Sequence, residues 1–294
     1  MHRFDASRPR FAVGNAMFGA LVPEHLDIVA AAGFPGLEPY RGLMMDYIDR
    51  PSELKTLLDQ RGLTICTISN GGRGMSVDFI DSERRKQTVA DHVAFARDVL
   101  TVFGCTYFKI NMGARPRAGT TDADVATIAE GINELGRATA ELGVRIAPHP
   151  HIWGPIERPE EVRRLLDLTD PAYVSWIPDT AQLNLGGGDP VELIDDYYDR
   201  IAAVHWKDSK ASYRGYTGPT PTHEMHQQQI LYKDLGAGGV DLPRIWELLQ
   251  ARSYKGWITL DLDPPRPAEG EGAAEEKLLI NRRYLLDTLR IAAL

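Results

Sequence analysis

Cysteine is nearly absent from this chain, because Cys66 and Cys105 are the only two among 294 residues. Two cysteines are too few for a disulfide framework or for a zinc site built from thiolates. Both lie in apolar runs typical of β-strands, so we expect buried, unpaired thiols. A chain of this length can bury a large core without such cross-links.

Long apolar runs are lacking as well. No stretch approaches the ~20 apolar residues of a membrane-spanning helix. The first residues, MHRFDASRPRFAV, contain no apolar segment of signal-peptide length. These absences predict a cytoplasmic protein with no membrane partner.

The sequence also has no basic stripe. Its formal net charge is −8, and Lys and Arg do not gather in any one segment. An acidic chain repels the phosphate backbone, which supplies much of the affinity of nucleic-acid-binding proteins. We therefore expect no nucleic-acid partner.

What the sequence does contain is an alternation of short β-type runs with longer amphipathic runs. Strands are predicted at residues 11–18, 36–40, 63–69, 106–112, 144–149, 174–179, 201–207 and 256–262. Helices are predicted at residues 23–33, 51–61, 83–103, 121–142, 159–168, 189–199, 241–252 and 273–291. This alternation predicts a parallel α/β sheet, and eight such units predict one closed (β/α)8 barrel, a TIM barrel, over residues 1–294.

Residues at the boundaries of these units support the division. Asp189 precedes Pro190 and can cap the helix that begins there. Gly62, Gly104 and Gly143 follow helical runs, where a residue in the left-handed conformation commonly ends a helix. The longest connection, residues 208–241, contains several aromatic residues and two histidines, so we expect a lid-like loop after the seventh strand.

Four consecutive predicted strand ends have side chains of the kind that bind metals. In α/β barrels the active site lies at the carboxyl ends of the strands. The candidate ligands at these ends are His149, Asp179, His205 and Asp261. Two imidazoles and two carboxylates suit one divalent metal ion, and the absence of a thiolate favours Mn²⁺ or Co²⁺, with Zn²⁺ and Mg²⁺ as alternatives. The competing interpretation is structural: a single strand-end histidine often packs in a core, and an aspartate before threonine often caps a helix.

Other charged and polar residues near the strand ends are candidates for catalysis. Lys109 lies inside an apolar strand, which is costly unless its side chain points into a polar cavity. Beside a metal ion it could act as a base, or its ammonium could pair with Glu38. His151 is a third candidate for proton transfer. Candidate substrate contacts are Asn15, Asn70, Arg73, Asn111, Trp153, Gln182, Lys207 and Asp208.

Several motifs resemble the sugar phosphate isomerase/epimerase superfamily, whose barrels are xylose-isomerase-like. They are DTAQ at 179–182, HWKD at 205–208, LGAGGVD at 235–241 and YKGWI at 254–258. The resemblance extends loosely over the whole chain. Within the superfamily, the segment His149-Pro150-His151 and the long loop after HWKD are similar to the inosose dehydratases.

The resemblance implies a metal ion held by strands 5 to 8, at positions that match His149, Asp179, His205 and Asp261. The usual set has glutamate at the first and last of these positions, and the common D-T-x-H motif has histidine where Gln182 stands. These departures leave the metal and the reaction open.

The chemistry that the resemblance implies is removal of a proton next to a carbonyl. Depending on where the proton returns, the outcome is epimerisation, isomerisation or dehydration. No phosphate-cradling glycine loop is evident, so an unphosphorylated keto-sugar or keto-inositol is favoured as the small-molecule substrate.

Three other functions remain open from the sequence. A related barrel cleaves C-glycosides through a 3-keto-glycoside, and an aromatic pocket around Trp153, Tyr213 and Tyr216 would favour it. An endonuclease of the abasic-site class is disfavoured by the charge and by a histidine count of eight. A barrel without catalysis could serve in binding or assembly. The oligomeric state is open between a single chain, a homo-oligomer and a complex with a partner subunit.

Overall fold

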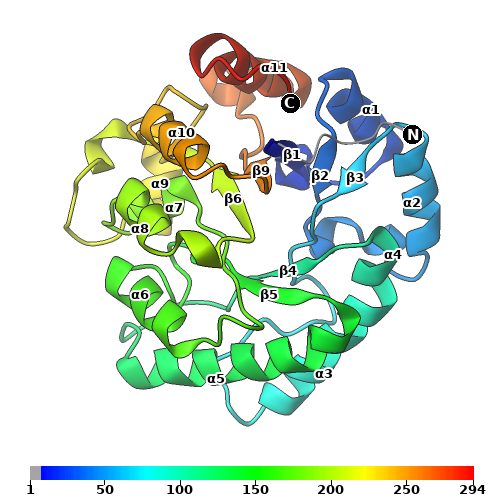
Figure 1. Ribbon diagram of the computed structural model, residues 1–294. Helices are drawn as coiled ribbons and strands as arrows, with labels where there is room; N and C mark the ends of the chain where they lie inside the picture. Colours follow the sequence, from blue (N-terminus) through cyan, green and yellow to red (C-terminus); the bar gives the residue numbers. More distant parts are fainter. Residues whose placement is uncertain (1–7) are drawn as a thin grey trace.

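The computed structural model describes residues 8–294, and its centre is a ring of parallel strands surrounded by helices (Figure 1). The strands of this ring that are regular over two or more residues are β1 (Arg10–Gly14), β2 (Gly36–Glu38), β3 (Thr64–Ile65), β4 (Tyr107–Ile110), β5 (Arg145–Pro148), β6 (Ala203–Trp206) and β9 (Trp257–Leu260). Parallel pairing joins β3, β2, β1, β9 and β6 in that order, and separately joins β4 to β5.

Isolated bridges close the ring between these two groups. Ser69 bridges to both Tyr40 and Lys109, which connects the β2–β3 side to β4. Residues 174–179 lie between β5 and β6, because Val174 pairs with Ile146 and Asp179 pairs with His205. The predicted barrel is confirmed, but the predicted strands at 63–69 and 174–179 are only partly regular.

Helices surround the strands on the outside of the ring (Figure 1). Their bounds are α1 (Pro23–Ala31), α2 (Pro51–Asp59), α3 (Arg85–Phe95), α4 (Thr101–Phe103), α5 (Asp122–Thr139), α6 (Pro159–Leu168), α7 (Thr180–Leu185), α8 (Pro190–Asp196), α9 (His223–Gln229), α10 (Leu242–Ala251) and α11 (Ala274–Arg283). The predicted helix at 83–103 is interrupted by a π-helical turn at Ala96–Leu100. The predicted strand at 11–18 ends at Gly14, after which Asn15–Phe18 form a 3-10 turn.

The expected boundary signals are present. The Asp189 carboxylate accepts the backbone N–H groups of Val191 and Glu192, and Pro190 is the first residue of α8. Gly62, Gly104 and Gly143 have φ angles of 67°, 68° and 68°, in the left-handed region. The thiols Cys66 and Cys105 are buried and unpaired, as expected.

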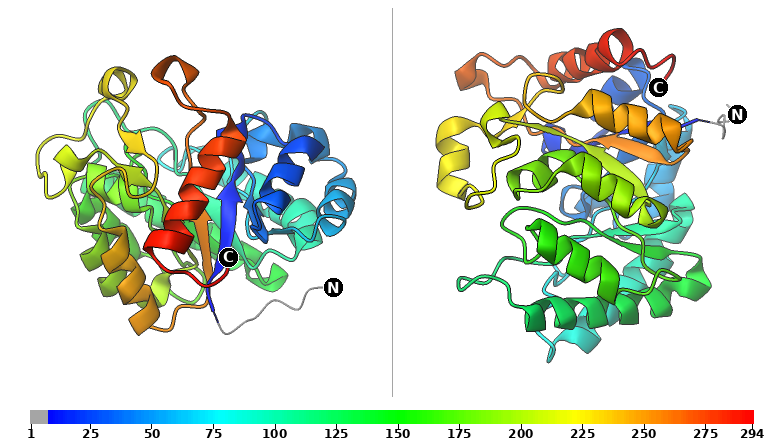
Figure 2. Two further views of the ribbon diagram at one scale, coloured as in Figure 1. Left: turned by 90° about the horizontal axis from the view of Figure 1, so that it is seen from above. Right: turned by 60° about the vertical axis from the view of Figure 1, so that its left-hand side comes forward.

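The connection from residue 208 to residue 241 is more regular than expected. It contains an antiparallel pair, β7 (Asp208–Ser209) with β8 (Tyr232–Lys233), and the helix α9 between them. The segment projects from the end of the barrel opposite to the start of β1, in yellow in Figure 2. The sequence HEMHQQQ has no apolar periodicity, but Thr222 caps the helix through the N–H of Met225, and this cap was overlooked.

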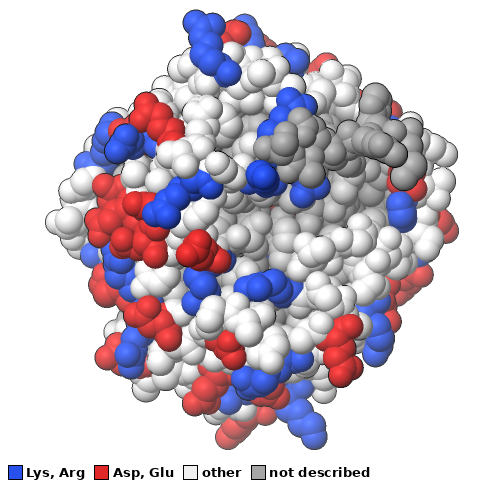
Figure 3. Space-filling view, viewed as in Figure 1, with Lys and Arg blue, Asp and Glu red and all other residues white. Residues whose placement is uncertain are grey.

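Among residues 8–294, no helix is long and apolar enough to cross a membrane. On the face seen in Figure 3, basic side chains are interspersed with acidic ones and form no continuous stripe.

Candidate functional site

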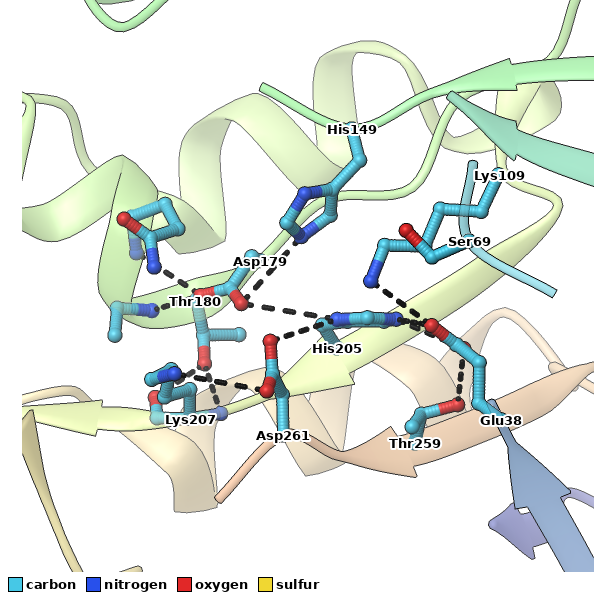
Figure 4. A network of polar contacts seen from close by, with 12 residues as sticks. Glu38, Ser69, Lys109, His149, Asp179, Thr180, His205, Lys207, Thr259 and Asp261 are labelled. Carbon is cyan, nitrogen blue, oxygen red and sulfur yellow. Dashed lines mark hydrogen bonds and ion pairs between the residues drawn. The ribbon is translucent and has the colours of Figure 1, made fainter. Parts of the chain in front are cut away.

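The four predicted metal ligands converge at the carboxyl ends of neighbouring strands. His149 directly follows β5, Asp179 ends the 174–179 segment, His205 lies in β6 and Asp261 directly follows β9. One ligand atom from each lies within 4.8 Å of those from the other three. Their side chains point toward one another in Figure 4, and the parallel register of the strands brings them together.

Individual distances show how tightly the group is built. His149 Nε2 lies 3.6 Å from Asp179 Oδ2, and His205 Nδ1 lies 3.8 Å from the same oxygen. His205 Nδ1 also lies 3.3 Å from Asp261 Oδ2. Asp179 and the two histidines are at most 2% exposed.

Unsatisfied polar atoms indicate that this group fits a metal ion. Both ring nitrogens of His149 and the Oδ2 atom of Asp179 are buried and lack a hydrogen-bond partner within residues 8–294. Buried polar atoms rarely remain unpaired, because each unmade bond costs about 1–3 kcal/mol. The other carboxylate oxygen of Asp179 caps α7 by accepting the N–H groups of Ala181 and Gln182. Asp179 is therefore both the helix cap and the candidate ligand that the sequence left as alternatives.

The electrostatic environment shifts the pKa values of the candidate ligands in different directions. Burial, assisted by the Lys109 ammonium, lowers the pKa of His149 well below its usual value, so its ring is neutral and available to a cation. Burial and the nearby Asp261 carboxylate raise the pKa of Asp179. Burial raises the pKa of Asp261, but the nearby Lys207 ammonium lowers it by more, so the pKa lies well below its usual value.

Glu38 lies behind His205 and is fully engaged by protein groups. Its carboxylate accepts hydrogen bonds from Lys109 Nζ at 2.9 Å and from Thr259 Oγ1 at 2.9 Å, and it lies 2.9 Å from His205 Nε2. Despite burial, His205 and Lys109 lower the pKa of Glu38. Burial alone would lower the pKa of His205, but Glu38 and Asp261 raise it. A carboxylate on the far nitrogen of a histidine typically fixes the orientation of a metal-binding ring.

Lys207 is a second buried lysine on the opposite side of the group. Its Nζ lies 2.8 Å from Asp263 Oδ1, 3.6 Å from Asp261 Oδ1 and 4.2 Å from the centre of the Tyr232 ring. Although burial opposes the charged form, Asp261 and Asp263 raise the pKa of Lys207. Lys207 is therefore a fixed positive charge beside the candidate ligands.

Two adjoining pockets open beside the metal-ligand group. The first, of about 220 Å³, is lined by the candidate ligands His149, His205 and Asp261 and by other predicted residues: Asn15, Glu38, Lys109, Asn111, His151 and Lys207. The second, of about 390 Å³, shares Asn111, His149 and His151 with the first and extends past Trp153.

Other predicted contacts do not line either pocket. Asn70 bonds to His92 and to both backbone polar groups of Asn111. Asp208 accepts four backbone N–H groups, from Ser209 and from residues 236, 238 and 240. Gln182 accepts bonds from the Ile152 N–H and the Tyr232 hydroxyl, and Arg73 is exposed. The side-chain polar atoms of Asn70 and Asp208 are therefore already hydrogen-bonded within the protein and are not available to a substrate.

Sequence reasoning did not select three residues with polar side chains that line the first pocket, namely Tyr40, Ser69 and Asp263. A usable signal existed for two of them. Tyr40 and Asp263 lie two residues after Glu38 and Asp261, and alternate residues of an extended chain face the same side.

This arrangement is that of an α/β barrel enzyme with its chemistry at the carboxyl ends of the strands. The family model described as xylose isomerase-like TIM barrel matches residues 26–283. The chain belongs to this family.

Curated relatives and solved structures agree with that assignment. The inosose dehydratase of Lacticaseibacillus casei is 27% identical over 289 residues, covering 90% of this chain and 89% of that protein. The inosose dehydratase of Bacillus velezensis is 27% identical over 292 residues, covering 94% and 90%. These relatives confirm the predicted resemblance and the prediction of an enzyme in the sugar isomerase, epimerase and lyase class.

Solved structures confirm the fold. The crystal structure of IOLI protein with a bound zinc atom has a TM-score of 0.76 at 13% identity, covering 95% of this chain and 98% of that one. The 3-keto-D-glucoside 4-epimerase from E. coli has a TM-score of 0.69 at 20% identity, covering 94% and 99%. At these identities the likeness establishes the barrel fold and nothing more specific.

Proposed function

We propose that this enzyme binds one divalent metal ion through His149, Asp179, His205 and Asp261 and removes a proton next to the carbonyl of a cyclic polyhydroxy ketone. The unpaired, buried ligand atoms of His149 and Asp179 within this tight group carry the proposal. The similarity to inosose dehydratases favours a keto-inositol as the substrate and dehydration as the outcome.

The donor set suits Mn²⁺ or Co²⁺ and is also compatible with Zn²⁺ or Mg²⁺. Such an ion would polarise the substrate carbonyl and stabilise the negative charge that develops on its oxygen when the proton is removed. Glu38 supports the site by orienting His205, because both of its carboxylate oxygens are already engaged by the protein.

We assign proton transfer to His151. Its Nδ1 atom lies 2.5 Å from the Ile152 carbonyl, which makes Nδ1 the donor and leaves the lone pair of Nε2 available. Nε2 has no partner in the described part of the chain, and His151 lines both pockets. The imidazole would accept the proton from the carbon next to the carbonyl. It would then return that proton to the departing hydroxyl in a dehydration, or to carbon in an isomerisation or epimerisation.

Lys109 and Lys207 have supporting roles in this proposal. Lys109 is paired with Glu38, so its ammonium donates to a substrate oxygen better than it removes a proton. Lys207 is held by Asp261 and Asp263 and contributes a second positive charge to the same pocket. Asn15 and Asn111 are the neutral groups that would bind hydroxyls of the substrate, since both line the first pocket.

Proton exchange tests the proposed function directly. The protein is loaded with Mn²⁺ and incubated with a keto-inositol in deuterated water, and the substrate is followed by nuclear magnetic resonance. We expect deuterium next to the carbonyl and then a dehydrated product, with both signals reduced at least about a hundredfold in His151→Asn. His25→Asn, at a histidine of α1 that lines neither pocket, is the matched control and should keep full activity.

The outcomes separate the parts of the proposal. Exchange without a dehydrated product would make the enzyme an isomerase or epimerase that uses the same site. No exchange in the metal-loaded protein would overturn the proposed reaction. A protein that retains no divalent ion and gains no thermal stability from Mn²⁺ or Co²⁺ would overturn the proposed metal site.

A further inference from the structure

The outer face of α11 has apolar side chains in contact with solvent. Within residues 8–294, four large hydrophobic side chains are exposed, and two of them, Leu279 and Ile280, are neighbours on this helix, with exposed fractions of 40% and 37%. In the left view of Figure 2, α11 lies on the outside of the barrel and no described segment lies in front of it. Single exposed apolar residues are common on proteins, whereas a contiguous group of them marks a contact surface.

The inner face of the same helix is polar. Lys277 and Asn281 are 7% and 0% exposed. The Lys277 ammonium pairs with Glu271 at 3.0 Å and with Asp234 at 3.2 Å, and Asn281 Nδ2 donates to Asp234 at 2.8 Å. Of the large apolar side chains of α11, only Leu278 is buried, and the other two face solvent. This is the reverse of the usual pattern of a surface helix, which turns its apolar residues toward the core.

A groove extends the apolar surface at the start of α11. It has a volume of about 740 Å³ and lies between α1 and residues 264–275. Its lining includes the partly exposed side chains of Phe18 and Ile28 and also Glu275 of α11. Glu275 lies one helical turn before Leu279, so the groove and the apolar pair are neighbours on the surface.

Two charged residues flank the apolar pair symmetrically. Glu276 precedes it and Arg283 follows it, and both side chains are exposed and have no ion-pair partner among residues 8–294. Seven residues make almost two helical turns, so both charges lie on the same face as Leu279 and Ile280. If two such helices pack antiparallel with Leu279 opposite Ile280, Glu276 of each helix lies opposite Arg283 of the other.

The order of these charges also suits the helix itself, because acidic groups near the start and basic groups near the end complement the helix dipole. That effect gives no reason for the exposure of Leu279 and Ile280. A second copy of the same face supplies both an apolar surface and the complementary charges in one register, so the face is its own complement.

We propose that the outer face of α11 is the contact surface of a homodimer, in which two copies of α11 pack antiparallel across a two-fold axis between Leu279 and Ile280. A ten-residue helix is only about 15 Å long, so the interface is small even with the groove beside it. We expect a dissociation constant in the micromolar range, as for weak interfaces. The face does not include the metal-ligand group, so this inference is independent of the proposed function.

Analytical ultracentrifugation of the full chain measures the proposed dimer. Between about 1 and about 100 µM, which brackets a micromolar dissociation constant, the mass should rise from one chain to two. Ile280→Asp should raise the dissociation constant at least about tenfold, because a single substitution buries a charge at two places in a two-fold interface. Met45→Asp is the matched control, since Met45 is another exposed apolar residue, lies outside α11 and should leave the dimer unchanged.

Exchanging the charges tests the antiparallel register. Glu276→Arg and Arg283→Glu each place like charges opposite one another and should raise the dissociation constant about three- to tenfold at low salt. The variant with both substitutions restores opposite charges and should dimerise within about twofold of the wild type. An effect through the helix dipole alone predicts the opposite order, because both substitutions are unfavourable for the dipole. Circular dichroism checks that each variant is folded.

Three outcomes would overturn the proposal. They are a wild type that remains a single chain up to about 100 µM, a dimer that Ile280→Asp does not weaken, and a double charge variant that dimerises no better than the single ones. Metal binding and proton exchange are measured separately, so failure of the dimer and failure of the proposed function are distinguishable.

Discussion

Two buried histidines in this barrel have opposite hydrogen-bonding environments. His92, in α3, is 0% exposed, and its Nδ1 and Nε2 atoms lie 2.7 Å from the Thr88 carbonyl and 2.9 Å from Asn70 Nδ2. His149, after β5, is 2% exposed, and neither of its ring nitrogens has a partner in the described chain. Burial lowers the pKa of both rings. The protein completes the bonding of His92 and leaves that of His149 to a ligand.

The same contrast separates two buried aspartates. Asp208 accepts backbone N–H groups with both oxygens and fixes the glycine-rich turn at 236–239. Asp179 uses one oxygen for a helix cap and leaves the other unpaired. Residue type and burial therefore do not distinguish a metal ligand from a structural group. The distinguishing property is whether each buried polar atom has a hydrogen-bond partner in the protein.

The largest expected effect is on metal binding. His149→Phe should lower the affinity for Mn²⁺ by more than the ~10–100-fold typical of losing a group that hydrogen-bonds to a metal ligand, with a parallel loss of activity. The metal-free protein should lose less than about 1 kcal/mol of unfolding free energy, because no protein partner of His149 is left unpaired. Metal titration by calorimetry and urea unfolding measure the two effects. Unchanged affinity would remove His149 from the ligand set.

The next largest expected effect is a loss of stability in acid, which arises from the buried histidine His92. Burial lowers the pKa of His92 to about 4, from an ordinary value of 6.5. The unfolded chain then binds this proton more tightly than the folded chain. The contribution of His92 to stability is therefore complete above about pH 6.5 and declines as the pH falls toward 4, by roughly 3 kcal/mol in total. Urea unfolding across this range, compared between wild type and His92→Phe, isolates this contribution. Parallel pH profiles of the two proteins would contradict the prediction.

At pH 8, where the ring is neutral, His92→Phe itself should reduce the unfolding free energy by about 1–3 kcal/mol. The loss arises because Asn70 Nδ2 loses one of its acceptors inside the core. The affinity for Mn²⁺ should stay within about twofold of the wild type, because His92 bonds to Thr88 and Asn70 and to none of the candidate ligands. This variant and His149→Phe are matched controls for each other, since each should change the property that the other preserves.

The sequence predicted the barrel and the four converging residues because both depend on chain periodicity. Strand–helix alternation is visible in the residue pattern, and parallel strands bring their carboxyl ends to one edge, so His149, Asp179, His205 and Asp261 could be grouped without coordinates. The pairing of Lys109 with Glu38 was also recognised as an alternative, because a buried lysine needs a carboxylate.

The bonding of most other polar side chains could not be predicted, because it depends on partners that are distant in the sequence and carry no charge pattern that reveals them. Asn70 and Asp208 were predicted to contact substrate because they follow strands. The His92 ring and the amides of residues 236–240 that engage them come from elsewhere in the chain. The ion pairs of Arg115 with Glu157 and Glu161 were also missed, since Arg115 lies about forty residues from both.

The smallest expected change in stability separates the two roles of Asp179. Asp179→Asn retains a side-chain oxygen that can cap α7, so the unfolding free energy of the metal-free protein should change by less than about 1 kcal/mol. The substituted amide loses the carboxylate charge at the unpaired position, so Mn²⁺ affinity should fall as in His149→Phe. Asp179→Ala removes the cap as well and should cost about 1 kcal/mol more.

Asp189→Ala is the matched control for this comparison, because Asp189 caps α8 in the same way and lines neither pocket of the site. It should lose about 1 kcal/mol of stability and keep the metal. Urea unfolding without metal and calorimetric titration with Mn²⁺ measure both properties for all three variants. If Asp179→Asn bound Mn²⁺ as tightly as the wild type, Asp179 would be a helix cap alone, and the contrast between paired and unpaired buried atoms would not identify the ligands of this site.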